Sequence, residues 1–203
     1  MHIPKMYRTN DLQVLKKIIS ENSFALLISS KPKLRATHAM MLWNDDNPEN
    51  PFVETHISMT NIQAKEISNG DELLCDFLGT HTYISSSWYN HINASTWNYE
   101  AVQILGIAEL MNNEELYNHL NKLTNKFESQ QKCPMTMEKM GEKFVNSAMK
   151  GAFGVKIYPT EISIAQKFSQ NRNDEDFANI IAQLEKSTSL VDKEMAEKMK
   201  LSR

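Results

Sequence analysis

Apolar residues spaced three or four positions apart predict amphipathic helices in several parts of the chain. The first such helix follows Thr9 or Asn10, either of which can cap it. Another shows a clear apolar stripe comprising Leu116, Leu120, Leu123 and Phe127. Asn173 precedes three acidic residues, a pattern typical of a capped helix start. The ranges predicted as helical are 9–23, 60–70, 112–130, 136–151, 173–187 and 190–203.

Short apolar or alternating runs predict strands between these helices. Residues 23–30 and 34–43 flank a "KPK" turn and are predicted to form a hairpin. Gly79 is expected to separate two strands. The remaining strand ranges are 52–59, 72–79, 80–87, 99–111 and 152–169. Strands followed by helices, rather than alternating with them, favour an α+β protein built on an antiparallel barrel. We expect a single domain over residues 1–203 with a helical extension over residues 170–203.

Composition narrows the class of protein. The chain has 203 residues and a net charge of −3, which gives no basic footprint for nucleic acid over the whole molecule. Cys75 and Cys133 stand far apart and are expected to be reduced thiols. No apolar run is long enough to cross a bilayer, and "MHIPKMYRTND" lacks the apolar core of a signal peptide. We therefore expect a cytoplasmic protein with no membrane partner.

Several common catalytic motifs are absent. The sequence contains neither GxGxxG nor GxxxxGK[ST], and it has no GxSxG elbow. Its six histidines show no HExxH spacing. The motifs therefore indicate no metal site and no catalytic base.

Two strand segments carry polar residues that fit a ligand. In "RATHAM", residues 35–40, polar side chains interrupt an otherwise apolar strand. In "THISMTNIQAK", residues 55–65, a strand ends where a short helix begins, so that hydroxyls, backbone N–H groups and Lys65 could hold a phosphate. The alternative at Thr60 and Asn61 is ordinary helix capping, which alone explains both residues and which the sequence favours.

A third segment, "SSSWYNHINASTWNYEA" at Ser85–Ala101, combines aromatic and amide side chains. Buried Trp and Tyr among so many polar groups would need many hydrogen-bond partners, and a loop has little use for so much aromatic surface. Further along, Gln170 and Arg172 carry donors suited to the carbonyls of a heterocycle. Together with the phosphate-like segment, this set describes FMN, although it also describes other nucleotides.

The motifs "MHIPKMYR", "ATHAM", "GTHTYISSSWY", "STWNYEAVQILG" and "FSQNRNDED" occur in the order found in the PaiB family, which the chain resembles over nearly its whole length. Members of this family are described as FMN-binding negative transcriptional regulators. The resemblance implies a six-stranded antiparallel split barrel with flanking helices, assembled as a homodimer with FMN at the subunit interface. The expected FMN contacts are Arg35, Thr37, His38, His56, Ser58, Asn61, Lys65, Tyr83, Trp88, Trp97, Asn98, Tyr99, Gln170 and Arg172.

One departure from the family pattern concerns the phosphate end. The family motif resembles GHMARANPQWR, whereas this chain has Met59 in place of the internal arginine. We therefore expect FMN binding that is weaker than in relatives with the arginine, and FMN that is easily lost.

Three functions remain open from the sequence. The first is a regulator or flavin-dependent sensor, the second an FMN-dependent oxidoreductase or flavin reductase using NAD(P)H, and the third an interaction module that has lost FMN. The sequence shows no helix-turn-helix pattern, so DNA enters as a partner by family analogy only.

Overall fold

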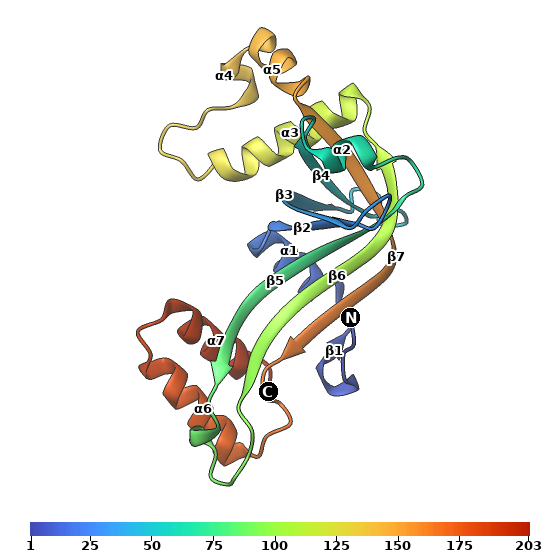
Figure 1. The fold of residues 1–203 in the computed structure, drawn as a ribbon. Coiled ribbons are helices and arrows are strands. Elements are labelled where there is room, and N and C mark those ends of the chain that lie inside the picture. The colour runs from blue at the N-terminus through green and yellow to red at the C-terminus, as the bar shows by residue number, and fades with distance from the viewer. The chain divides into compact units, whose positions relative to one another are not determined.

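The computed structural model describes residues 1–203 and contains seven strands and seven α-helices. The strands are β1 (Arg8–Thr9), β2 (Phe24–Ser29), β3 (Arg35–Asn44), β4 (Phe52–Ser58), β5 (Glu72–Ile84), β6 (Thr96–Leu110) and β7 (Ala152–Lys167). The helices are α1 (Leu12–Glu21), α2 (Ile62–Glu66), α3 (Asn113–Glu128), α4 (Met137–Met140), α5 (Glu142–Met149), α6 (Asp174–Lys186) and α7 (Leu190–Leu201), with short 3₁₀ turns η1 (Lys5–Tyr7) and η2 (Ser86–Trp88) (Figure 1).

The chain forms two compact units. The barrel unit consists of Ser23–Asp76 and Ile104–Ile162, and the terminal unit consists of Met1–Asn22, Phe77–Gln103 and Ser163–Arg203. The strand order is β1-β7-β4-β3-β2-β5-β6, and an additional β7–β6 pairing closes six of these strands into a ring. The expected α+β fold on a six-stranded antiparallel barrel is therefore confirmed.

Alternating burial on adjacent strands builds the core of the barrel unit. The β2–β3 hairpin pairs Leu27 with Thr37, and β3 continues into β4, where Trp43 pairs with Val53. Inward side chains such as Leu27 and Val53 are fully buried. Successive side chains point to opposite faces of a strand, so the intervening residues are left for the outer surface of the barrel.

Helix α3 contacts β4 through a largely polar layer. Its start is fixed by a capping box, in which Asn112 accepts from the N–H of Glu115 and Glu115 accepts from that of Asn112. Lys156 of β7 is buried in the same unit and pairs with Glu109 and Glu115. Those two partners satisfy a cation that would otherwise be costly to bury.

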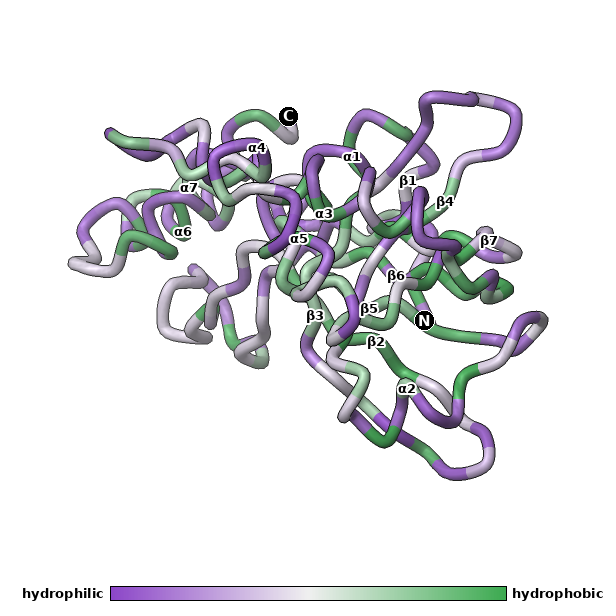
Figure 2. The backbone as a smooth tube through the Cα atoms, turned by 90° about the horizontal axis from the view of Figure 1, so that it is seen from above, coloured by the Kyte–Doolittle hydropathy of each residue, from purple (hydrophilic) through white to green (hydrophobic).

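In the terminal unit, α7 packs against α6, and its side chains hydrogen-bond to residues of β5 and β6. The core here includes Phe168, Ile180, Met195 and Met199. Figure 2 shows hydrophobic and hydrophilic residues mixed along α6 and α7, as expected for helices with one buried face.

Several element predictions need correction. The two strands expected on either side of Gly79 are one strand, β5, which continues through Gly79 into Thr80. A Cβ on Gly79 would lie 2.6 Å from Cγ of Glu100. The glycine therefore makes room for a neighbouring side chain and does not end the strand. The range 136–151 forms two helices, since Gly141 adopts a φ of +80° between them. Asp11 caps α1, in place of Thr9 or Asn10.

Candidate functional site

The barrel unit contains one candidate ligand site at the junction between β4 and α2. We call it the β4–α2 junction and define it as Ser58, Met59, Thr60, Asn61 and Lys65. The hydroxyls of Ser58 and Thr60 lie 2.8 Å apart, and both residues are exposed. The Thr60 N–H donates to Ser58 Oγ at 3.2 Å. Lys65 is also exposed. The junction thus offers two hydroxyls and one ammonium group to solvent.

The junction is anchored to the barrel by two amide side chains. Asn61 caps α2 through Oδ1, which accepts from the Gln63 N–H, while its Nδ2 donates to Thr37 Oγ1 at 3.0 Å. The buried Gln63 donates from Nε2 to Leu27 O and Ser29 Oγ, both at 3.1 Å. The capping expected for Asn61 is confirmed. Capping does not account for the exposed hydroxyls of Ser58 and Thr60 or for Lys65.

Arg35 lies beside this junction but already has a partner. Its Nε and Nη2 donate to the two carboxylate oxygens of Glu66, each at 2.9 Å. These hydrogen bonds lower the pKa of the Glu66 carboxyl below its ordinary value. The bidentate pair neutralises Arg35 locally, so Lys65 is the better placed cation for an anionic ligand.

His56 belongs to a row of polar side chains that joins β4 to α3. Its Nδ1 lies 3.0 Å from Nε2 of His119, and Nδ1 of His119 lies 3.6 Å from Oε2 of Glu54. His119 is fully buried, and burial together with His119 lowers the pKa of His56 to about 4. His56 is therefore neutral at pH 7 and serves as a hydrogen-bonding group.

His38 occupies an exposed position on β3. Its ring stacks on that of Phe24 with centroids 5.4 Å apart. Phe24 is itself 64% exposed. This pair forms a small aromatic surface on the β2–β3 hairpin.

In the terminal unit, the aromatic residues within and just before the Ser85–Ala101 segment divide into two groups. Tyr83 and Trp97 are about half exposed and meet edge to face, with centroids 6.2 Å apart. His81 is tilted against the same Trp97 ring at 6.1 Å. Trp88, in contrast, packs against the hydrophobic core of this unit. Only the first group forms an open aromatic surface.

The polar motif after β7 builds a tight turn. Ser169 adopts a φ of +61°, and its hydroxyl donates to Oδ1 of the fully buried Asn98 at 3.1 Å. The amide of Gln170 closes the turn at both ends, accepting from Phe168 N and donating to Gln166 O. The polar atoms of Asn98 and Gln170 are thus engaged within the unit, which gives both side chains a structural role.

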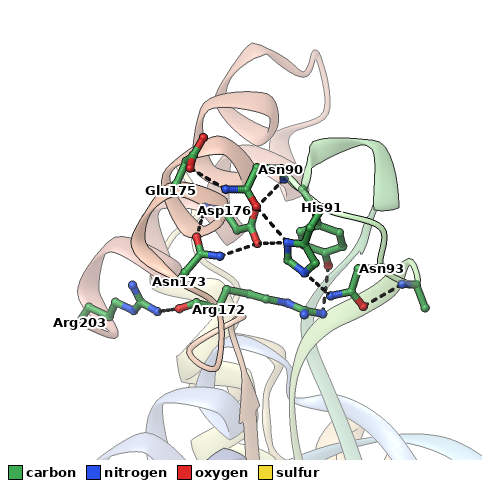
Figure 3. Close-up of polar contacts among 10 residues, drawn as sticks. Asn90, His91, Asn93, Arg172, Asn173, Glu175, Asp176 and Arg203 are labelled. Carbon is green, nitrogen blue, oxygen red and sulfur yellow. Dashed lines mark hydrogen bonds and ion pairs between the residues drawn. The ribbon is translucent and has the colours of Figure 1, made fainter.

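Arg172 leaves this turn and lies over an aromatic ring. Its guanidinium carbon is 4.5 Å from the centroid of Tyr89, and Nη2 donates to the Tyr89 hydroxyl at 3.4 Å. Nε of Arg172 is buried and has no hydrogen-bond partner. Figure 3 shows the Arg172 side chain running past His91 toward Asn93. The Arg172 guanidinium is thus held by Tyr89 and forms no ion pair with a carboxylate.

The sequence-based list of FMN contacts therefore separates by unit. Arg35, Thr37, Ser58, Asn61 and Lys65 are associated with the β4–α2 junction, while the residues numbered from Tyr83 onward belong to the terminal unit. Sequence reasoning missed His119 and also Tyr7 and Lys167, which lie near Arg172. Tyr7 is part of the motif "MHIPKMYR", and this motif could have pointed to Tyr7 as a candidate site residue.

Comparisons with known proteins bear on this arrangement. Residues 1–161 match the family described as "Putative FMN-binding domain". The chain is also 34% identical over 200 residues to the protease synthase and sporulation protein PAI 2 of Bacillus subtilis (strain 168), covering 98% of this chain and 96% of that protein. Both matches extend over the barrel unit and most of the motifs quoted above.

Solved structures share the fold at low sequence identity. The FAD and heme binding protein from Mycobacterium smegmatis superposes with a TM-score of 0.60 at 12% identity, covering 85% of this chain and 79% of that one. The flavocytochrome Anf3 from Azotobacter vinelandii gives a TM-score of 0.57 at 17% identity, covering 87% and 78%. These likenesses support the fold alone.

None of the helices is both long enough and apolar enough to span a membrane.

Proposed function

The chain belongs to the PaiB family of FMN-binding proteins, and on that basis we propose that it is a flavin-dependent sensor or regulator that holds the FMN phosphate at the β4–α2 junction. FMN is the cofactor of this family. When bound, it supplies a redox-active isoalloxazine ring that absorbs visible light.

The observation that carries the proposal is the chemistry of the junction. Ser58 and Thr60 present exposed hydroxyls 2.8 Å apart, and the exposed Lys65 carries a positive charge without a carboxylate partner. A phosphate monoester accepts several hydrogen bonds and favours a nearby cation. The residues present therefore fit the phosphate end of FMN.

The anchoring of the junction also supports this role. Asn61 and Gln63 tie α2 to β2 and β3, so the backbone that carries the hydroxyls and Lys65 is fixed before any ligand arrives. Binding groups fixed in advance lose less conformational entropy when a ligand is bound. Arg35, already paired with Glu66, stabilises the junction rather than contributing a free charge.

We further propose that the exposed aromatic surface of Tyr83 and Trp97 faces a second copy of the chain, in a homodimer with FMN at the interface. Support comes from the 52% exposure of Trp97, since large aromatic rings are enriched at subunit interfaces. An obligate interface buries on the order of 2,000 Å² or more in total. Light scattering at micromolar concentration should report a dimer, and a stable monomer would contradict this assembly.

The binding proposal is tested by the visible spectrum of purified protein before and after adding FMN. Addition of FMN is expected to give a saturable change in the flavin spectrum, together with no sustained NAD(P)H consumption. Sustained turnover would favour the oxidoreductase alternative. The absence of any spectral change on adding FMN would favour an interaction module.

A further inference from the structure

Four of the sequence motifs meet in one cluster of the terminal unit. The cluster consists of Tyr7, Tyr89, Tyr99, Lys167 and Arg172, and we call it the tyrosine–arginine cluster. Nζ of Lys167 lies 5.9 Å from the centroid of Tyr7, and the Arg172 guanidinium lies over Tyr89. Burial raises the pKa of Tyr7, and Arg172, Tyr89 and Tyr99 are near enough to influence that pKa as well. Three phenols and two cations therefore share one region.

The two cations of this cluster have no counter-ion. Lys167 donates to Thr96 and Arg172 to Tyr89, and neither forms an ion pair with a carboxylate. Burial lowers the pKa of Lys167, and Arg172 lowers it further through like-charge repulsion. Partly buried cations placed close together are unfavourable unless a negative charge is added.

The acidic residues nearest in sequence to Arg172 have other partners, and Figure 3 shows those of Glu175 and Asp176. Asp176 accepts from the Asn90 N–H at 2.8 Å and from Asn173 Nδ2 at 3.0 Å, and it pairs with His91 at 3.3 Å. Asp174 pairs with Arg203 at 2.9 Å. These carboxylates fix the start of α6 and do not neutralise the cluster.

The turn before α6 holds Arg172 in place. The left-handed Ser169, tied to Asn98, and the doubly bonded Gln170 define the backbone, and the N–H of Arg172 closes the turn onto Ser169 O at 3.0 Å. Ser169, Gln170 and Asn173 of the "SQNRN" motif thus have structural partners. The buried Nε of Arg172 is left with an unused donor. An unsatisfied buried donor is unusual and indicates a missing hydrogen-bond acceptor.

We propose that the tyrosine–arginine cluster binds the phosphate group of a small molecule other than the protein's flavin. A guanidinium provides a planar pair of donors that matches two phosphate oxygens, and Lys167 and the tyrosine hydroxyls supply further donors. This role assigns Arg172 to an anion rather than to the flavin ring. A flavin protein with a separate phosphate site can couple the state of its cofactor to a second metabolite.

The test is a calorimetric titration of inorganic phosphate into the full-length protein, with and without saturating FMN, at ionic strength held constant with chloride. Saturable binding is expected in both states. Arg172→Gln and Lys167→Met should each raise the dissociation constant about tenfold, because each removes a charge-assisted hydrogen bond. Lys193→Met, which removes an exposed lysine of α7 in the same unit, should leave phosphate affinity unchanged.

Several results would overturn the proposal. One is the absence of saturable phosphate binding, and another is equal affinity in wild type, Arg172→Gln and Lys167→Met. Loss of phosphate binding on saturation with FMN, but not with riboflavin, would show that the cluster holds the flavin's own phosphate. Should Arg172→Gln fail to fold, Arg172→Lys retains the charge without the paired donors and must still weaken binding.

Discussion

Met59 is the residue whose side chain most directly limits the proposed phosphate site. It is 45% exposed at the end of β4, and its N–H donates to Gly151 O, so its backbone is fixed while its side chain is free to change. Arginine at this position would add two parallel donors for phosphate where methionine has none. Met59→Arg should tighten FMN binding by about tenfold or more in a fluorescence titration.

A matched control for this change is Met135→Arg. Met135 is 51% exposed in the same unit and lies outside the junction. Met135→Arg therefore adds the same charge to the protein as Met59→Arg does, and its affinity for FMN should equal that of the wild type. If both arginine variants tighten FMN equally, the gain comes from overall charge, and Met59 does not adjoin the phosphate.

His56 should make the protein sensitive to acid. Its pKa falls from 6.5 to about 4 on folding, because the ring is desolvated and lies beside His119. The unfolded chain therefore binds more protons than the folded one between these values. Stability is complete above pH 6.5 and is lost as the pH falls toward 4, by an amount on the order of 3 kcal/mol.

Urea unfolding at several pH values between 7.5 and 4.5 measures this effect. His56→Gln should flatten the pH dependence, whereas His38→Gln, which removes an exposed histidine of the same unit, should not. A profile for His56→Gln that follows the wild type would assign the acid sensitivity to another group.

For individual residues, the sequence identified polar side chains able to form hydrogen bonds better than it identified their partners. The amides of Asn98 and Gln170 have the donors expected of ligand contacts, yet in the structure they bond to Ser169 and to the backbone. A local motif cannot reveal whether an amide meets a ligand or a turn, because both use the same hydrogen bonds. His119 was missed since a single histidine on an otherwise apolar helix stripe gives no signal of its buried partner.

Helix α7 is attached to β6 by a buried ion pair. Lys198 pairs with Glu100, which is only 3% exposed, and also lies near Glu21 and Glu194. Removing the lysine leaves a buried carboxylate without its partner. Lys198→Met should therefore lower the free energy of unfolding by about 3–5 kcal/mol.

Denaturant unfolding of two further variants tests the reason for this loss. Glu100→Gln combined with Lys198→Met removes both charges and should recover much of the stability. Lys200→Met, which breaks only exposed pairs with Glu185 and Glu197, should cost less than about 1 kcal/mol. An equal loss in all three variants would show that α7 is held by general packing alone.

Helices and strands followed from periodicity wherever burial is one-sided. The β2–β3 hairpin and α3 were predicted with nearly correct bounds because their patterns repeat at periods of two and 3.6. Breaks were predicted less well. Gly79 permits close approach of Glu100 and Gly141 provides a positive φ, and these two uses of glycine look the same in a sequence.

On the scale of the whole molecule, the family resemblance predicted the barrel, but the division into two units had no signal in the sequence. Strands β5, β6 and β7 each contribute residues to both units, so no linker or change of composition marks a boundary. The candidate FMN contacts likewise belong to both units. The order of the motifs along the chain did not predict this, because it carries no information on the distances between residues in the fold.

The central claim, that this molecule holds the phosphate of FMN at the β4–α2 junction, is tested most directly by comparing FMN with riboflavin in wild type and Lys65→Ala. Lys132→Ala, another exposed lysine of the barrel unit, is the control. Fluorescence titration should show FMN binding weakened about tenfold or more by Lys65→Ala, with riboflavin binding unchanged and Lys132→Ala without effect. Equal FMN affinity in wild type and Lys65→Ala, or an equal loss for riboflavin, would contradict the assignment.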